Sequence, residues 1–227
     1  MKFKTLIPTA LILMQVNCMA QSNTLSAPAP VKNTEKTDFL AAALEKAKAS
    51  KSAADIQSSV NEIKRIESMD PNNWLPNYYI SYLEIVQSFF TNPESKDALL
   101  EDAKKRADKL LENNAADKSE VYTLLGYYYY GKIAQDSQKN GQLYFKEVIG
   151  NYQKAIALNS KNPRPNYLLN LFEEKMNAFM GNKDSNICEK LNQSKELFAN
   201  FKPVNKNDPN WGEKDLLTNL ESKCSKK

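Results

Sequence analysis

Tyrosines are the side chains of this sequence with the clearest capacity for recognition chemistry. Four of them form an unbroken run in Gly126-Tyr127-Tyr128-Tyr129-Tyr130-Gly131. Each tyrosine combines a large apolar ring with a hydroxyl group that donates or accepts a hydrogen bond, which suits a binding surface. Four consecutive positions cover a full turn of helix, so the four rings cannot all face one core. The run therefore indicates either a binding surface or rings that cover neighbouring helices.

Catalytic and metal-binding patterns are missing from the sequence. Histidine is absent, which removes the commonest general base and a common metal ligand. The cysteines do not have metal-ligand spacing, and we find no phosphate-binding glycine loop or nucleophile elbow. Carboxylates are plentiful and are most simply interpreted as solvated helix faces. We therefore expect no catalytic residue, no metal site and no cofactor.

The first twenty residues are typical of a secretory signal peptide. Lys2 and Lys4 precede the apolar stretch Leu6–Met14, and small residues precede a cleavage position after Ala20. The apolar stretch is well short of the ~20 residues that span a bilayer. A buried N-terminal helix and a lipoprotein signal with Cys18 as the lipidated residue are the alternatives. The Ala20–Gln21 junction resembles signal peptides of Bacteroidetes, so we expect a periplasmic or secreted protein.

Three segments follow from this interpretation: a signal peptide at 1–20, a leader at 21–36 and a folded domain at 37–227. The leader, QSNTLSAPAPVKNTEK, is rich in Ser, Pro, Ala and Asn and has almost no apolar anchor, which predicts a flexible segment. The length of the remainder suits one medium domain or a short helical solenoid.

Two cysteines, Cys188 and Cys224, remain after removal of the signal peptide. An even pair in an exported chain predicts a disulfide, here between the last two helices. Closing such a loop stabilises a fold by roughly 3–4 kcal/mol in the chain-entropy description. The alternative is two unpaired thiols.

Charge and composition exclude one large class of function. The formal net charge is +4, and two lysines of the signal peptide leave 4 − 2 = +2 for the rest. This small and dispersed excess is not the basic patch of a nucleic-acid-binding protein. The apolar content of 41% is sufficient for a core, and no segment alternates like a strand.

Apolar periodicity near 3.6 residues predicts an all-α domain of nine helices. Their approximate ranges are 38–49, 53–69, 75–90, 95–113, 119–134, 141–158, 165–180, 186–200 and 211–222. The first eight form four antiparallel pairs, and the ninth would cover the open apolar end. Gly181-Asn182 is a candidate C-cap for the seventh helix.

Two stretches of the sequence repeat each other without a gap. Val60–Glu84 (VNEIKRIESMDPNNWLPNYYISYLE) matches Ile149–Glu173 (IGNYQKAIALNSKNPRPNYLLNLFE), with a constant offset of 165 − 76 = 89 residues. Each stretch joins the end of one predicted helix to the start of the next. Such a repeat is typical of helical-repeat proteins.

Motifs within these pairs resemble the tetratricopeptide-repeat (TPR) family over about 53–201. The matches are Tyr152 to Leu158 (YQKAIAL), Asp70 to Asn73 (DPNN), and Leu125-Gly126 followed by Tyr129. The resemblance implies a right-handed solenoid of about four antiparallel helix pairs with a concave groove. Departures are the 89-residue offset, where the family repeats every ~34 residues, and about ten extra residues at 134–142.

The resemblance also implies which residues face the groove. Carried over position by position, it places these side chains there or at its C-terminal end: Tyr78, Tyr82, Tyr127, Tyr130, Tyr167, Leu171, Glu174 and Lys175. The alternative for each tyrosine is packing on neighbouring helices. For Trp74 and Trp211 we expect packing across the junctions between repeats.

Three functions compete at this point. The first is a non-enzymatic, monomeric scaffold that binds a protein or peptide of the cell envelope in the tyrosine-lined groove, without nucleic acid, cofactor or transmembrane segment. The second is an outer-membrane assembly lipoprotein anchored at Cys18. The third is a glycan-binding protein or an enzyme with a hidden carboxylate pair.

Overall fold

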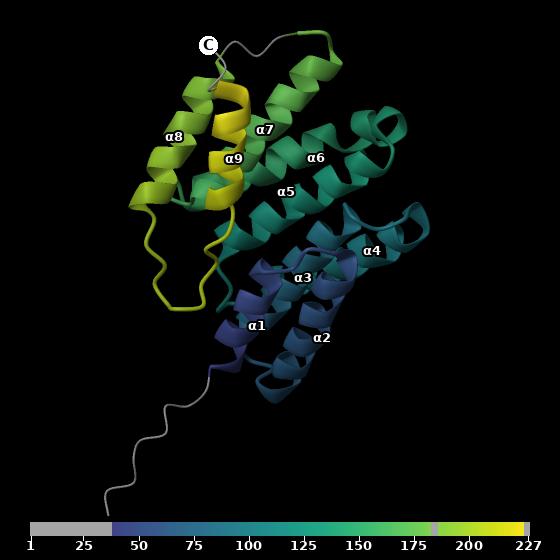
Figure 1. Ribbon diagram of the computed structural model, residues 1–227, viewed down its shortest axis with the longest axis vertical. Coiled ribbons are helices and arrows are strands. Elements are labelled where there is room, and N and C mark those ends of the chain that lie inside the picture. Colours follow the sequence, from purple (N-terminus) through teal and green to yellow (C-terminus); the bar gives the residue numbers. More distant parts are fainter. Residues whose placement is uncertain (1–37, 183–185, 225–227) are drawn as a thin grey trace, which may run out of the picture. The chain divides into compact units, whose positions relative to one another are not determined.

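The computed structural model describes residues 38–182 and 186–224, which form nine α-helices and no strand (Figure 1). The prediction of an all-helical domain is therefore confirmed for this part of the chain. The helices are α1 (Phe39–Lys48), α2 (Ala53–Met69), α3 (Trp74–Ser88), α4 (Pro93–Glu112), α5 (Lys118–Gln135), α6 (Ser137–Leu158), α7 (Pro163–Phe179), α8 (Ile187–Asn200) and α9 (Glu213–Cys224). The predicted signal peptide, the leader and Cys18 lie outside the described residues.

Short polar side chains set where most of these helices begin. Helices α1 to α7 each start after a residue whose side-chain oxygen accepts a backbone N–H of the first turn. These N-caps are Asp38, Ser52, Asn73, Asn92, Asp117, Asp136 and Asn162. Such a cap stabilises a helix by about 1 kcal/mol. The C-cap expected after α7 is also present, because Gly181 has a φ of 77°.

The expected insertion at 134–142 is wrong. Only Asp136 separates α5 from α6, and the segment continues in helical form. The Asp136 carboxylate accepts the backbone N–H of Lys139 at 3.0 Å, and the Asn140 amide donates to the Lys132 carbonyl at 2.7 Å. These two contacts start α6 four residues earlier than the apolar pattern indicated, because the first turn of α6 is polar.

Each helix packs against the next one in the chain, as Figure 1 shows. In addition, α3 contacts α5, and α5 contacts α7. The odd-numbered helices α3, α5 and α7 therefore lie in a row, and this row supplies most of the candidate site. None of the helices described here is both long and apolar enough to cross a bilayer.

The close contact between Gly126 of α5 and Tyr152 of α6 shows why a small residue is needed at this crossing. A Cβ atom at Gly126 would lie 2.5 Å from the Tyr152 ring, well inside van der Waals contact. Tyr152 is almost fully buried there, with 1% of its surface exposed. The Leu125-Gly126 pair of the TPR resemblance therefore marks a real point of close helix packing.

The predicted disulfide between Cys188 and Cys224 is confirmed. It joins the start of α8 to the end of α9, with the two Cα atoms 5.7 Å apart. This bond ties the C-terminal helix to the rest of the domain, where Leu216 of α9 is fully buried.

Candidate functional site

Two adjoining cavities lie along α5 and α7. The first, which we call the tyrosine cavity, has a volume of about 130 Å³. It is lined by Tyr82, Tyr127, Tyr130, Tyr152, Tyr167, Leu168, Leu171, Phe172, Lys175, Trp211 and Asp215. The second, the apolar cavity, has a volume of about 490 Å³. It is lined by Tyr130, Ile133, Ala134, Ser137, Gln138, Gly141, Gln142, Phe145, Phe172, Lys175, Met176, Phe179 and Met180. Tyr130, Phe172 and Lys175 line both, so the cavities share a wall.

Helical periodicity brings the walls of the tyrosine cavity together. Tyr127 and Tyr130 are three residues apart on α5, and Leu171 and Lys175 are four apart on α7, so each pair shares one helix face. Tyr82 contributes from α3. The rings of Tyr127 and Tyr130 are nearly parallel, with centroids 6.4 Å apart.

Trp211, from the connector between α8 and α9, closes one side of the tyrosine cavity. Its indole ring stacks on Tyr82 with centroids 4.4 Å apart and lies 6.2 Å from the Tyr127 ring. The connector is also bound to α3, since the Tyr79 hydroxyl donates to the Asn207 carbonyl at 3.0 Å. The chain itself therefore fills part of the face where an open groove was expected.

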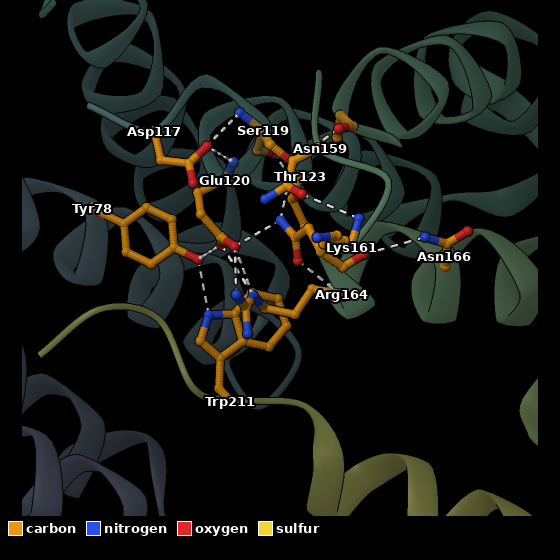
Figure 2. Close-up of polar contacts among 12 residues, drawn as sticks. Tyr78, Asp117, Ser119, Glu120, Thr123, Asn159, Lys161, Arg164, Asn166 and Trp211 are labelled. Atoms are coloured by element: carbon orange, nitrogen blue, oxygen red, sulfur yellow. Dashed lines mark hydrogen bonds and ion pairs between the residues drawn. The ribbon is translucent and has the colours of Figure 1, made fainter. Parts of the chain in front are cut away.

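A buried ion pair anchors this connector (Figure 2). Arg164 of α7 is fully buried, and its Nε lies 2.9 and 3.1 Å from the two carboxylate oxygens of Glu120 on α5. The Tyr78 hydroxyl donates to Glu120 at 2.6 Å and accepts the indole N–H of Trp211 at 2.9 Å. The Arg164 guanidinium also lies over the Phe201 ring, 4.6 Å from its centroid.

Asn162 extends the network beyond Glu120. Its amide donates to Glu120 at 2.7 Å and to the Ser119 hydroxyl at 3.1 Å, and that hydroxyl donates to the Ala155 carbonyl at 2.9 Å. Burial and the Glu120 charge raise the pKa of Tyr78 well above its ordinary value, so its hydroxyl keeps its proton. The network links α3, α5, α7 and the connector to one another, and Nη1 of Arg164 is the one buried atom of the described network without a hydrogen-bond partner.

The tyrosine cavity contains phenol hydroxyls that have no partner within the described residues. The hydrogen bonds of this part of the chain include none to the hydroxyl of Tyr82, Tyr127 or Tyr152. Burial raises the pKa of each of the three phenols. They remain neutral over the physiological range and keep a proton to donate.

The apolar cavity is formed by the end of α5, the beginning of α6 and the end of α7. Lys175 is the sole charged side chain among its lining residues. At its rim, Phe179 is 73% exposed and Met180 is 56% exposed, which is unusual for large apolar side chains. Contiguous exposed apolar surface of this kind is typical of a ligand or partner site.

Most of the eight residues predicted for the groove line the tyrosine cavity, and the other two lie elsewhere. Six of them line the tyrosine cavity: Tyr82, Tyr127, Tyr130, Tyr167, Leu171 and Lys175. Tyr78 is instead fully buried in the polar network, and Glu174 forms an ion pair with Lys223 at 2.8 Å. Trp74 packs edge-to-face on Tyr78, with centroids 5.6 Å apart.

Several site residues did not follow from the sequence. Tyr152, which is not among the residues expected at the groove, has a buried ring and also lines the tyrosine cavity. The sequence does not predict the apolar cavity, because part of its wall comes from the segment 134–142, for which the TPR resemblance implies an insertion. The exposed apolar pair Phe179-Met180, next to the helix-ending Gly181, was the available signal.

Comparisons with known proteins give one informative result. No protein-family model and no curated protein matches the chain. Among solved structures, the HusA haemophore from Porphyromonas gingivalis matches with a TM-score of 0.72 and 22% sequence identity. The match covers 85% of this chain and 96% of that chain. This chain has the same fold. A haemophore is a haem-binding protein.

Proposed function

We propose that this protein is a non-enzymatic binding protein of the cell envelope or its exterior, and that it captures haem or a related tetrapyrrole in the apolar cavity. The observation that carries the proposal is the cavity itself: an apolar pocket with one cation and no carboxylate among its lining residues. The fold shared with a haemophore supports it.

The size and chemistry of the apolar cavity match such a ligand. Small-molecule sites have volumes of roughly 300–1,000 Å³ and mostly apolar walls with a few polar groups, and this cavity of about 490 Å³ is within that range. A tetrapyrrole presents a broad apolar face and carboxylates at one edge. Phe145, Phe172 and Phe179 would cover the face, and Lys175 would attract the carboxylates.

The chain has no histidine, so a bound haem iron would need a different protein ligand. Tyrosine and methionine both ligate haem iron in proteins. Tyr130, Met176 and Met180 line the apolar cavity and are the residues present for that role. The residues therefore fit the macrocycle, with an iron environment unlike that of a histidine-ligated protein.

A small ligand suits the site better than the peptide considered from the sequence. A peptide would need an open groove along α3, α5 and α7, and Trp211 stacks on Tyr82 there. We retain as proposals the TPR-like solenoid arrangement, the monomeric state and export by a signal peptide. The disulfide supports an oxidising compartment, because such bonds persist outside the cytoplasm.

Titration with haemin tests the proposed function. Haemin is added to the purified protein, and the Soret absorbance and the quenching of tryptophan fluorescence are followed. We expect both signals to saturate near one equivalent, with a dissociation constant in the micromolar range or below. A linear, non-saturating response equal to that of an unrelated helical protein would contradict the proposal.

A further inference from the structure

The tyrosine cavity is lined by three tyrosines whose hydroxyls make no hydrogen bond within the described residues. Tyr152 is 1% exposed, lines the cavity, and makes no hydrogen bond that the described residues account for. Tyr82 and Tyr127 are only partly buried, but they line the same cavity and their hydroxyls also make no hydrogen bond within the described residues. None of the three hydroxyls is among the fully buried polar atoms that lack a partner, so each of them is accessible from the cavity. Three accessible donors in one small cavity can bind a group that enters it.

The three tyrosines line one small cavity. Ionisation of Tyr82 or Tyr152 would repel a charge on Tyr127, and these neighbours add to burial in raising its pKa. The three come from three different helices, α3, α5 and α6, and converge on a single small cavity of about 130 Å³. Neutral phenols donate one hydrogen bond each, so together they favour a group with several acceptor oxygens.

The charges around the cavity favour an anion next to its outer wall. The Lys175 ammonium lies in the wall shared with the apolar cavity, and it has no carboxylate within ion-pair distance among the described residues. Asp215 also lines the tyrosine cavity and opposes an anion there. Burial raises the pKa of Asp215, which weakens that opposition because the charged form is disfavoured.

We propose that the tyrosine cavity is a carboxylate subsite: the hydroxyls of Tyr82, Tyr127 and Tyr152, with the Lys175 ammonium, bind a carboxylate of the ligand whose apolar body occupies the apolar cavity. This inference rests on the proposed function and specifies it. The ligand class is then an amphipathic molecule with an acidic edge, such as a porphyrin dicarboxylate, and the two cavities form one continuous site.

The wall shared by the two cavities allows one ligand to contact both of them. Tyr130, Phe172 and Lys175 line both cavities, so a ligand seated against the apolar wall has its edge beside the tyrosine cavity. The Lys175 ammonium donates to the Tyr130 hydroxyl at 2.6 Å. The Lys175 ammonium therefore lies at the junction, where an acidic edge would pass from one cavity to the other.

The test compares an acid with its ester in matched variants. Metal-free protoporphyrin IX, a dicarboxylate, and its uncharged dimethyl ester are titrated separately, with fluorescence quenching as the signal. The variants are Tyr152→Phe and Tyr82→Phe, which remove one hydroxyl and keep the ring. Tyr144→Phe is the control, since Tyr144 is on α6 but lines neither cavity. Thermal melting confirms that each variant is folded.

We expect Tyr152→Phe to weaken protoporphyrin binding about tenfold, the loss typical of one hydrogen bond to a charged group. Binding of the dimethyl ester should be unchanged, and Tyr144→Phe should match the wild type with both ligands. Tyr82→Phe should give the same pattern, which keeps the test decisive if one variant does not fold.

Two results would overturn the subsite. One is equal affinity of the wild type for acid and ester. The other is a Tyr152→Phe protein that binds the acid as the wild type does or loses both ligands equally. In either case porphyrin binding itself would stand. Failure of the wild type to bind either porphyrin would instead refute the proposed function, and the carboxylate subsite with it.

Discussion

The ammonium of Lys175 on α7 donates a hydrogen bond to the hydroxyl of Tyr130 on α5 at 2.6 Å, and it lies 5.3 Å from the centre of the same ring. Both residues line both cavities. This exposed contact places the lysine ammonium at the junction of an apolar wall and a group of phenols. A cation at this position can select an apolar ligand that carries an acidic group.

Replacement of Lys175 tests this selection. Lys175→Gln removes the charge and keeps most of the chain length, so we expect affinity for a porphyrin dicarboxylate to fall about fivefold, a loss of about 1 kcal/mol typical of a partly solvated charge. Isothermal titration calorimetry measures the change. The control is Lys154→Gln on α6, an exposed lysine away from both cavities. Equal affinities of the Lys175 variant and the wild type would show that the cation plays no part.

Gly126 is predicted to be intolerant of a methyl group. Gly126→Ala would place a Cβ 2.5 Å from the Tyr152 ring, so the ring must move, at a cost of about 1–3 kcal/mol in the free energy of unfolding. Gly150→Ala on α6 meets no atom within 4 Å and should stabilise the protein by up to about 1 kcal/mol. Urea denaturation of both variants measures the difference. A Gly126→Ala protein as stable as Gly150→Ala would be inconsistent with this packing.

The buried ion pair should be costly to break. Glu120→Gln leaves the fully buried Arg164 charge without its counterion, and we expect a loss of about 3–5 kcal/mol in unfolding free energy. The comparison is Glu173→Gln, which removes a half-exposed partner of Lys190 and should cost less than about 1 kcal/mol. Similar losses for the two variants in chemical denaturation would mean that the network does not hold the connector.

The raised pKa of the buried Glu84 carboxyl should make the free energy of unfolding depend on pH. Burial raises the pKa of its carboxyl from an ordinary value of 4.5 to about 7, although the Lys64 ammonium bonded to it at 2.9 Å opposes the shift. The folded state then binds more protons than the unfolded state between pH 4.5 and 7. The stability from this proton is complete below pH 4.5 and is lost as the pH rises through about 7.

The variant Glu84→Gln keeps a neutral side chain at every pH. Between pH 5 and 8, its unfolding free energy should therefore decline less than that of the wild type, by on the order of 2 kcal/mol. Glu62→Gln, which removes the partner of Lys46 on the surface, should follow the wild-type pH profile. Parallel profiles for Glu84→Gln and the wild type would contradict the raised pKa.

Local sequence features were sufficient to predict most of the helices, and together with the TPR resemblance they predicted part of the lining of the tyrosine cavity. Side chains such as Ser52 and Asp117 mark helix starts because a cap acts within its own turn. The TPR resemblance implied a shared groove position for Tyr127 and Tyr130, and both line the tyrosine cavity. In contrast, the polar start of α6 at Ser137 has no apolar period, so the boundary and the apolar cavity beside it were missed.

The rest of the candidate site depends on contacts between residues far apart in the sequence. The position of Trp211 depends on its hydrogen bond to Tyr78, 133 residues earlier in the sequence. The burial of Tyr78 depends likewise on Glu120, which belongs to another helix. Periodicity places a side chain on a face of its own helix, but it does not reveal which distant segment will cover that face. The sequence therefore predicted an open groove where the connector lies.

A haemin titration of Gly141→Trp tests the central claim most directly. Gly141 lines the apolar cavity, and a Cβ there meets no atom within 4 Å, so an indole at this position would occupy the cavity without a clash at its base. Gly150→Trp adds the same side chain to the same helix outside both cavities, again with no atom within 4 Å of the Cβ. The account predicts at least about tenfold weaker haemin binding by Gly141→Trp, and wild-type affinity for Gly150→Trp. Undiminished binding by a folded Gly141→Trp protein would contradict it.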